Sequence, residues 1–289
     1  MTRNTQDSAA EPTGPVGVVG AGTMGVGVCH SLIRSGCDVV VVEPDRRAAD
    51  AARDRLAESL RLARLLGRGP AGETGRVRWA TAVGELDGTG FVVECAPEHL
   101  GLKEKLFTEL DRVCPPDAVL ASCTSAIPVA LLAARTERPE RVLGLHFMNP
   151  VPLKDTVEVV RAESTSPETM DRALALLARL GKQGVVVADG PGFVLNRVLM
   201  MCVAEAAALV DEGAVDAATV DAVFEKCLGH PMGPLRTADL IGLDNVLDTL
   251  TVLGEQTGDD RYRPPSSFTA LVAAGHLGRK TGRGFHVYA

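Results

Sequence analysis

The chain has 289 residues, of which 46% are hydrophobic and 23% are charged, so it is long enough for two folded domains. A formal net charge of −7 argues against nucleic-acid binding, which requires a basic face, and no apolar run is long enough to cross a membrane. Its seven cysteines lack CxxC spacing and indicate reduced thiols in a cytoplasmic protein; neither a signal peptide nor a metal site is predicted.

The composition divides the chain into three parts. Residues 1–15 are polar and aperiodic, and we expect a disordered leader there. Apolar strands alternate with helical patterns over residues 16–189, which predicts an α/β fold with a Rossmann-like dinucleotide-binding domain. Residues 190–289 show no strand pattern before the very end and predict an all-α domain for substrate binding and dimerisation. The helix expected over 193–211 is apolar on nearly every face, which favours a homodimer.

The expected elements follow from periodicity and from glycine and proline breaks. After the first strand, helix and second strand, the first domain is expected to contain a helix over 45–66, strands over 90–96 and 118–122, a helix over 100–113, a strand–turn–strand over 141–158, a helix over 166–180 and a strand over 185–188. The second domain is expected to contain helices over 193–211, 216–228, 235–253 and 266–274.

A glycine motif follows the first predicted strand. The chain runs from that strand into Gly20-x-Gly22-x-x-Gly25, continues as a helix, and returns in a β-branched strand that ends in Glu43. Gly20 allows a tight turn, Gly22 allows backbone to approach a pyrophosphate, and Gly25 allows close packing of helix on sheet. Glu43 would accept hydrogen bonds from the ribose hydroxyls and repel a 2′-phosphate. This unit predicts NAD as the cofactor rather than NADP.

The stretch from Arg141 to Val160 is apolar into His146, turns at a Pro-rich segment, and returns through Glu158. The return predicts that Glu158 lies beside His146, and a histidine oriented by a carboxylate is a common general base. On these residues alone, a satisfied core histidine and a solvated glutamate are the simpler interpretation.

Seven segments in one order resemble the short 3-hydroxyacyl-CoA dehydrogenases, of the 3-hydroxybutyryl-CoA dehydrogenase type. The similarity extends from Val16 to Tyr288. The segments are VGAGTMG at 19–25, ECAPEHLGLK at 94–103, HFMNPVP at 146–152, PGFVLNR at 191–197, GHPMGP at 229–234, DLIGLD at 239–244 and GRKTGRGF at 278–285.

The resemblance implies NAD-dependent interconversion of a 3-hydroxyacyl thioester and its 3-oxoacyl thioester. It implies that His146 is the base, that Glu158 orients it, that Ser125 positions the substrate oxygen, and that Asn196 holds the reacting carbonyl side. The implied cofactor-binding residues are Gly20, Gly22, Thr23, Met24, Gly25, Glu43, Glu98, Lys103, Ser125 and Asn149. The implied substrate-binding residues are Ser59, Ser125 and Asn196. For Glu98 and Lys103, a charge pair on a helix face is an equal alternative.

Three departures from the family pattern affect the expected site. Cys123 replaces an asparagine that precedes the Thr-Ser pair, Asp155 replaces a lysine (Lys154 is shifted by one place), and Leu66 replaces a lysine near the coenzyme A contact. The segment after Ser59 also looks shortened, and it is the segment that holds the nucleotide end of coenzyme A in the family.

These departures keep three alternatives open. In the first, the acyl group is a short, glyceryl-like unit on an acyl carrier protein of polyketide extender-unit biosynthesis, and Arg61, Arg64 and Arg68 meet that acidic partner. In the second, the chain oxidises a free hydroxy acid. In the third, it is a catalytically inactive NAD-binding relative, although retention of the four implied catalytic residues argues against this.

Overall fold

The computed structural model describes residues 14–288 apart from 68, 70 and 71. The expected leader, up to residue 13, falls outside the described residues. The chain forms two compact units, the first ending at Asp189 and the second beginning at Gly190.

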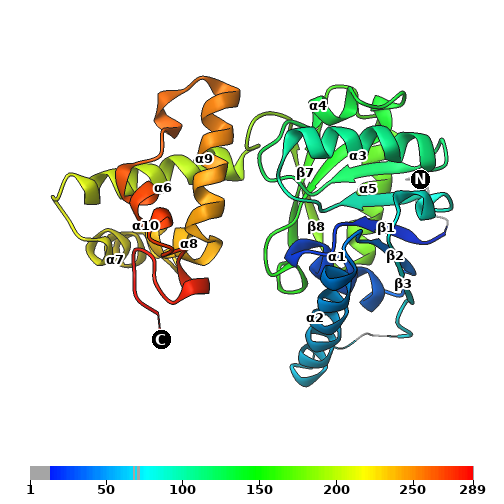
Figure 1. Cartoon of the computed structure of the whole chain (residues 1–289), viewed down its shortest axis with the longest axis horizontal. Helices are drawn as coiled ribbons and strands as arrows, with labels where there is room; N and C mark the ends of the chain where they lie inside the picture. The colour runs from blue at the N-terminus through cyan, green and yellow to red at the C-terminus, as the bar shows by residue number, and fades with distance from the viewer. Residues whose placement is uncertain (1–13, 68, 70–71, 289) are drawn as a thin grey trace, which may run out of the picture. The chain divides into compact units, whose positions relative to one another are not determined.

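One eight-stranded sheet forms the centre of the first unit (Figure 1). Neighbouring strands are parallel except for β6 and β7, which are antiparallel. In spatial order the strands are β3 (Val77–Ala80), β2 (Val39–Val42), β1 (Val16–Val19), β4 (Phe91–Glu94), β5 (Val119–Ser122), β6 (Val142–His146), β7 (Thr156–Arg161) and β8 (Gln183–Ala188).

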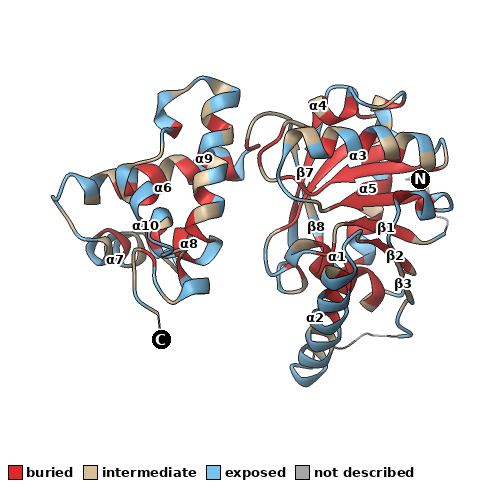
Figure 2. Ribbon diagram, viewed as in Figure 1, coloured by how far each residue is buried: buried red, intermediate tan, exposed pale blue. Residues whose placement is uncertain are grey.

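Helices cover the sheet and bury its central strands. Every residue of β1, β2, β4 and β5 is buried (Figure 2), as expected of parallel strands that are covered on both faces. The helices of this unit are α1 (Thr23–Arg34), α2 (Arg46–Leu65), α3 (Leu100–Val113), α4 (Val129–Ala133) and α5 (Pro167–Arg179). The predicted α/β class is therefore confirmed.

The second unit is helical. Its helices are α6 (Leu195–Asp211), α7 (Ala217–Leu228), α8 (Pro234–Ile241), α9 (Leu243–Thr257) and α10 (Ser266–Ala273). Two buried aspartates connect its parts. Asp221 accepts hydrogen bonds from the first amides of α8 and lies 2.7 Å from His286 Nε2, and Asp239 accepts the amides of Phe285 and His286. None of the helices in the described residues is long and apolar enough to span a membrane.

Two expectations about the elements were wrong. The single helix expected over 235–253 is divided into α8 and α9 at Gly242, whose φ of +102° a right-handed helix cannot include. Strand β3 was not expected, because this edge strand contains Arg78 and only Ala80 in it is buried. An edge strand needs no continuous apolar run, so its sequence gives a weak signal.

Candidate active site

The predicted site residues of the first unit gather at one edge of the sheet. Strands β1, β2, β4, β5 and β6 are mutually parallel, so their carboxyl ends meet at the same edge. The glycine motif follows β1, Glu43 follows β2, Glu98 follows β4, Ser125 follows β5, and His146 ends β6. Ligands bind at this edge in open α/β sheets.

His146 and Glu158 form a buried pair. They are direct partners in the antiparallel register of β6 and β7, so their side chains lie on the same face of the sheet. His146 Nδ1 is 2.9 Å from Glu158 Oε2, and the two residues are 5% and 8% exposed. The interpretation of Glu158 as a solvated residue was therefore wrong. The carboxylate fixes the ring and favours a proton on Nδ1, which suits Nε2 for proton transfer.

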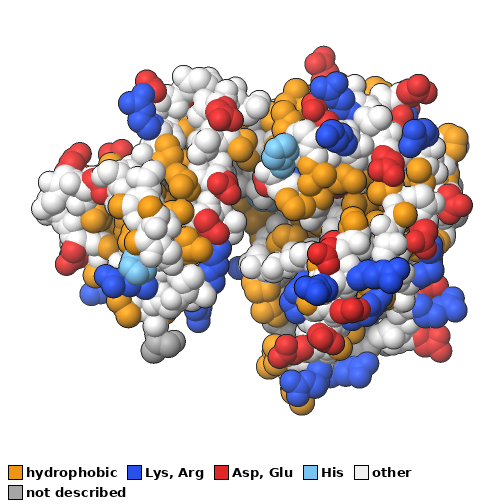
Figure 3. All heavy atoms as spheres, viewed as in Figure 1, with side chains coloured by type: hydrophobic (Ala, Val, Ile, Leu, Met, Phe, Trp, Pro, Cys, Tyr) orange, Lys and Arg blue, Asp and Glu red, His pale blue; other side chains and the backbone are white. Residues whose placement is uncertain are grey.

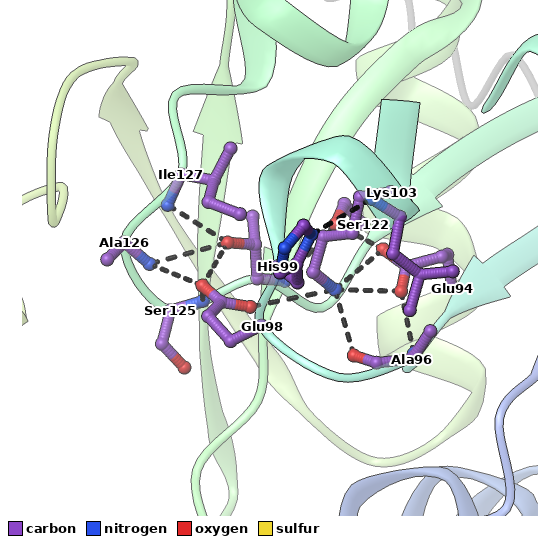
Figure 4. Close-up of polar contacts among 11 residues, drawn as sticks. Glu94, Ala96, Glu98, His99, Lys103, Ser122, Ser125, Ala126 and Ile127 are labelled. Atoms are coloured by element: carbon purple, nitrogen blue, oxygen red, sulfur yellow. Dashed lines mark hydrogen bonds and ion pairs between the residues drawn. The ribbon is translucent and has the colours of Figure 1, made fainter. Parts of the chain in front are cut away.

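Glu98 holds the loop that carries Ser125 (Figure 4). Its Oε1 accepts hydrogen bonds from the amides of Ser125 at 2.9 Å and Ala126 at 3.0 Å, and from the hydroxyl of Thr124. The Thr124 hydroxyl oxygen in turn accepts the Ile127 amide at 3.0 Å. A carboxylate that receives several donors at once restricts the loop to one conformation. Glu98 thus positions Ser125 at the end of β5.

A buried ion pair lies behind this loop. Lys103 Nζ is 2.7 and 2.9 Å from the two carboxylate oxygens of Glu94, and it is 3.6 Å from Glu98 Oε2. Glu94 also accepts a hydrogen bond from the Ser122 hydroxyl at 2.7 Å. Burial disfavours the ammonium, but the carboxylates of Glu94 and Glu98 outweigh that effect and raise the pKa of Lys103. Lys103 is 1% exposed, so an exposed charge pair on a helix face does not describe it.

The glycine motif has the geometry that a dinucleotide requires. A Cβ at Gly25 would lie 1.9 Å from the Gly20 carbonyl oxygen, so only glycine fits there. A Cβ at Gly22 would meet nothing within 4 Å, which leaves the backbone open to a phosphate. Helix α1 begins at this point without a side-chain cap and without an acidic residue in its first turn. Its N-terminal amides therefore fit the pyrophosphate of NAD.

Glu43 lies against this motif from the end of β2. Its Oε2 accepts a hydrogen bond from the Ala21 amide at 3.0 Å, and its Oε1 accepts one from the Asp45 amide at 3.2 Å. The carboxylate thus stands beside the glycine loop, where it would meet the ribose hydroxyls of the cofactor.

A small cavity of about 180 Å³ lies between α1, α2 and the turn that follows β6. It brings together three predicted residues from distant parts of the sequence: Thr23, Ser59 and Asn149. The remaining lining residues are Val26, Gly27, Arg55, Pro150, Val151 and Pro152. Met24 packs partly buried against the core of the first unit instead of lining the cavity. The cavity is large enough to hold part of an extended ligand.

The three departures lie in different surroundings. Cys123 is buried beside Cys95, and a hydrogen bond between the two thiols, with burial, raises the pKa of Cys95 well above its usual value. Lys154 and Asp155 are exposed in the turn before β7, and Leu66 is 61% exposed at the end of α2. None of the described hydrogen bonds links these side chains to His146 or Glu158.

The remaining residues are Asn196, which was predicted from the sequence, and Glu94, Ser122 and Thr124, which were not. Asn196 lies in the second unit, buried in the first turn of α6, and its approach to His146 stays a prediction. Sequence reasoning did not single out Glu94, Ser122 or Thr124. The signal for Glu94 was an acid at the end of an apolar strand, where a buried charge requires a partner.

The site combines an imidazole that is oriented by a carboxylate with a dinucleotide-binding loop at the same sheet edge. An acid lies where that loop would meet the ribose. This combination defines the class of nicotinamide-dependent dehydrogenases.

The comparisons with known proteins give the family. Residues 15–190 match the model described as 3-hydroxyacyl-CoA dehydrogenase, NAD binding domain, and residues 192–288 match the model of the C-terminal domain of that family. The chain belongs to the 3-hydroxyacyl-CoA dehydrogenase family and is an NAD-dependent oxidoreductase.

Individual relatives match over nearly their full length. A Bacillus subtilis protein named probable 3-hydroxybutyryl-CoA dehydrogenase is 42% identical over 277 residues, which cover 94% of this chain and 96% of the relative. The 3-hydroxybutyryl-CoA dehydrogenase of Bradyrhizobium diazoefficiens is 40% identical, with 94% of each chain covered. The crystal structure of FadB2 from M. tuberculosis has a TM-score of 0.90 at 40% identity, covering 95% of this chain and 99% of that one.

Proposed function

We propose that this enzyme interconverts a short 3-hydroxyacyl-CoA, such as 3-hydroxybutyryl-CoA, and its 3-oxoacyl-CoA with NAD as the redox partner. The observation that carries the proposal is the buried His146–Glu158 pair, joined at 2.9 Å at the sheet edge that also holds the glycine motif. The substrate class is supported by the relatives, which are named 3-hydroxybutyryl-CoA dehydrogenases. Coenzyme A is therefore favoured as the carrier.

In this proposal each residue of the site has one task. NAD, when bound, supplies the acceptor for the hydride that leaves C3 of the substrate. His146 Nε2 takes the proton of the C3 hydroxyl, and Glu158 stabilises the imidazolium that forms. Ser125, fixed through its loop by Glu98, donates a hydrogen bond to the reacting oxygen. Asn196 holds the thioester carbonyl, and the same groups act in reverse when the 3-oxoacyl group is reduced.

The alternative of an acyl carrier protein has no support among the relatives, whose names give coenzyme A substrates. Arg61 and Arg64 are exposed on α2, and Arg68 lies outside the described residues. Acidic and basic side chains mix over α2 (Figure 3), whereas a surface that docks an acidic carrier protein requires one dominant positive sign. A solvated helix face explains these arginines sufficiently.

A panel of substrates tests the proposal. The purified chain is expected to reduce NAD with 3-hydroxybutyryl-CoA much faster than with free 3-hydroxybutyrate or with the same acyl group on a carrier protein. Because Glu43 lies at the ribose position, NADP is expected to be a poor substitute for NAD in each reaction. The measurement is the initial rate of NADH formation. A preference for the carrier-protein substrate or for the free acid would contradict the choice of coenzyme A.

We also propose that the chain forms a cytoplasmic homodimer through its second unit. Helix α6 exposes Leu195 at 40%, Val198 at 65% and Leu209 at 39%, an apolar surface that a second copy would cover. The seven cysteines are thiols rather than disulfides, as is usual in a reducing compartment. Sedimentation at twice the chain mass is expected, and a monomer at micromolar concentration would contradict the dimer.

A further inference from the structure

His30 is a buried histidine that the reaction does not use. It lies on α1, is 1% exposed, and its Nδ1 is 2.7 Å from the hydroxyl oxygen of Ser59 on α2. Ser59 is one of the residues that line the 180 Å³ cavity between α1, α2 and the turn after β6. His30 therefore stands directly behind a polar group of that cavity.

The surroundings of His30 determine how it bonds to Ser59. Burial, and then the positive charges of Arg34 and Lys182, lower the pKa of His30 to about 4, so the ring is neutral near pH 7. A neutral imidazole carries one N–H, and Nε2 is buried without a hydrogen-bond partner among the described residues. Burying an unpartnered N–H is rarer than burying an unpartnered acceptor, which favours the tautomer with hydrogen on Nδ1.

In that tautomer Nδ1–H donates to Ser59, and the hydroxyl hydrogen of Ser59 is directed away from His30. The other lining residues of the cavity also suit a ligand that accepts hydrogen bonds. Arg55, which donates to the Ala21 carbonyl at 2.8 Å, brings a positive charge to the lining. The lining residue Val151 is held by Lys182, whose ammonium donates to the carbonyls of Val151 at 2.7 Å and Lys154 at 2.6 Å.

We propose that His30 is a positioning residue for substrate recognition: it fixes the Ser59 hydroxyl as a hydrogen-bond donor to an acceptor oxygen in the coenzyme A arm of the thioester. The inference rests on the proposed function, because it assumes that the substrate carries that arm. The acceptor is an amide or a phosphate oxygen, since both occur along the arm and both accept from a hydroxyl.

The test compares three thioesters of the same 3-hydroxybutyryl group. The methyl thioester lacks the arm, the pantetheine thioester has its amides without the nucleotide phosphates, and the coenzyme A thioester has both. His30→Ala is expected to raise KM for the coenzyme A thioester about 10-fold, the effect of about one hydrogen bond, with kcat nearly unchanged. KM for the methyl thioester and for NAD is expected to stay within about 2-fold. A rise that extends to the pantetheine thioester indicates an amide, and a rise confined to coenzyme A indicates a phosphate.

Further variants separate positioning from packing. His30→Gln, whose amide can donate to Ser59, is expected to restore most of the affinity. Ser59→Ala is expected to match His30→Ala, and the double variant to be no worse than Ser59→Ala, because His30 acts through that hydroxyl. Ser31→Ala, which removes a bond of 3.1 Å to the Gly27 carbonyl inside α1, is the matched control and is expected to change neither constant.

Binding of butyryl-CoA, measured by calorimetry, gives a readout that does not depend on turnover. Its Kd is expected to rise about 10-fold in His30→Ala and Ser59→Ala alike. An equal KM rise for all three thioesters, or additive effects in the double variant, would overturn the inference. If 3-hydroxybutyryl-CoA is oxidised normally by Ser59→Ala, the contact is wrong while the proposed function stands. If no thioester is oxidised by the unmodified chain, the proposed function itself fails.

Discussion

His146→Ala is expected to lower kcat by about 10² to 10⁴-fold, the range contributed by a positioned general base. The variant removes the group proposed to take the hydroxyl proton, while the glycine motif and Glu43 remain in place. NAD affinity is therefore expected to stay within about 2-fold of the original value. Steady-state rates with 3-hydroxybutyryl-CoA, together with NAD binding followed by fluorescence, provide the measurement.

Two further variants test whether the loss of kcat is specific to the His146–Glu158 pair. Glu158→Gln is expected to lower kcat as well, because a neutral amide cannot stabilise the imidazolium across the 2.9 Å contact. His276→Ala removes a histidine of the second unit that has no side-chain hydrogen bond among the described contacts, and it is expected to leave kcat unchanged. A His146→Ala protein that binds NAD and retains more than about a tenth of kcat would contradict the assignment of the base.

Lys103→Met is expected to have the largest effect on stability. The substitution leaves the Glu94 carboxylate, which is 0% exposed, without the ammonium that lies 2.7 Å away. Removing one partner of a buried ion pair lowers the unfolding free energy by about 3–5 kcal/mol. The midpoint of urea unfolding is expected to fall accordingly, and NAD binding is expected to weaken, because Lys103 also neutralises Glu98 beneath the Ser125 loop.

The control for this prediction lies on the same helix. Lys105 is exposed on α3, and Lys105→Met is expected to change the unfolding free energy by less than about 0.5 kcal/mol. Replacing both partners, as in Glu94→Gln with Lys103→Met, is expected to recover a large part of the loss, since no buried charge is then unpaired. If Lys103→Met unfolds at the same urea concentration as Lys105→Met, the buried pair does not stabilise the fold as described.

The sequence predicted those parts of the site that depend on local chain geometry. The glycines around Gly22 have fixed spacing after a buried strand, and Glu43 ends the next strand, so both could be placed from periodicity and spacing. The strand–turn–strand containing His146 and Glu158 joins two consecutive strands, so the return of Glu158 toward His146 could be predicted from the sequence. Each of these features is determined within one or two neighbouring elements.

Other features depend on contacts that no local pattern reveals. Lys103 looks like a surface residue of an amphipathic helix, and only the packing of α3 against the end of β4 brings it onto Glu94. His30 appears as one polar residue on a helix, and its bond to Ser59 requires the packing of α1 on α2. The turn at Gly242 was missed because a single glycine within an apolar helical pattern is often tolerated.

Transfer of deuterium from C3 of 3-hydroxybutyryl-CoA to NAD tests the central claim most directly. One turnover with substrate deuterated at C3 is expected to yield 3-oxobutyryl-CoA and NADH that carries the deuterium, and His146→Ala is expected to abolish both on the same timescale. Mass spectrometry of the reduced cofactor measures the transfer. Folded protein that binds NAD and the thioester but gives unlabelled cofactor, or no reduced cofactor, would contradict the claim.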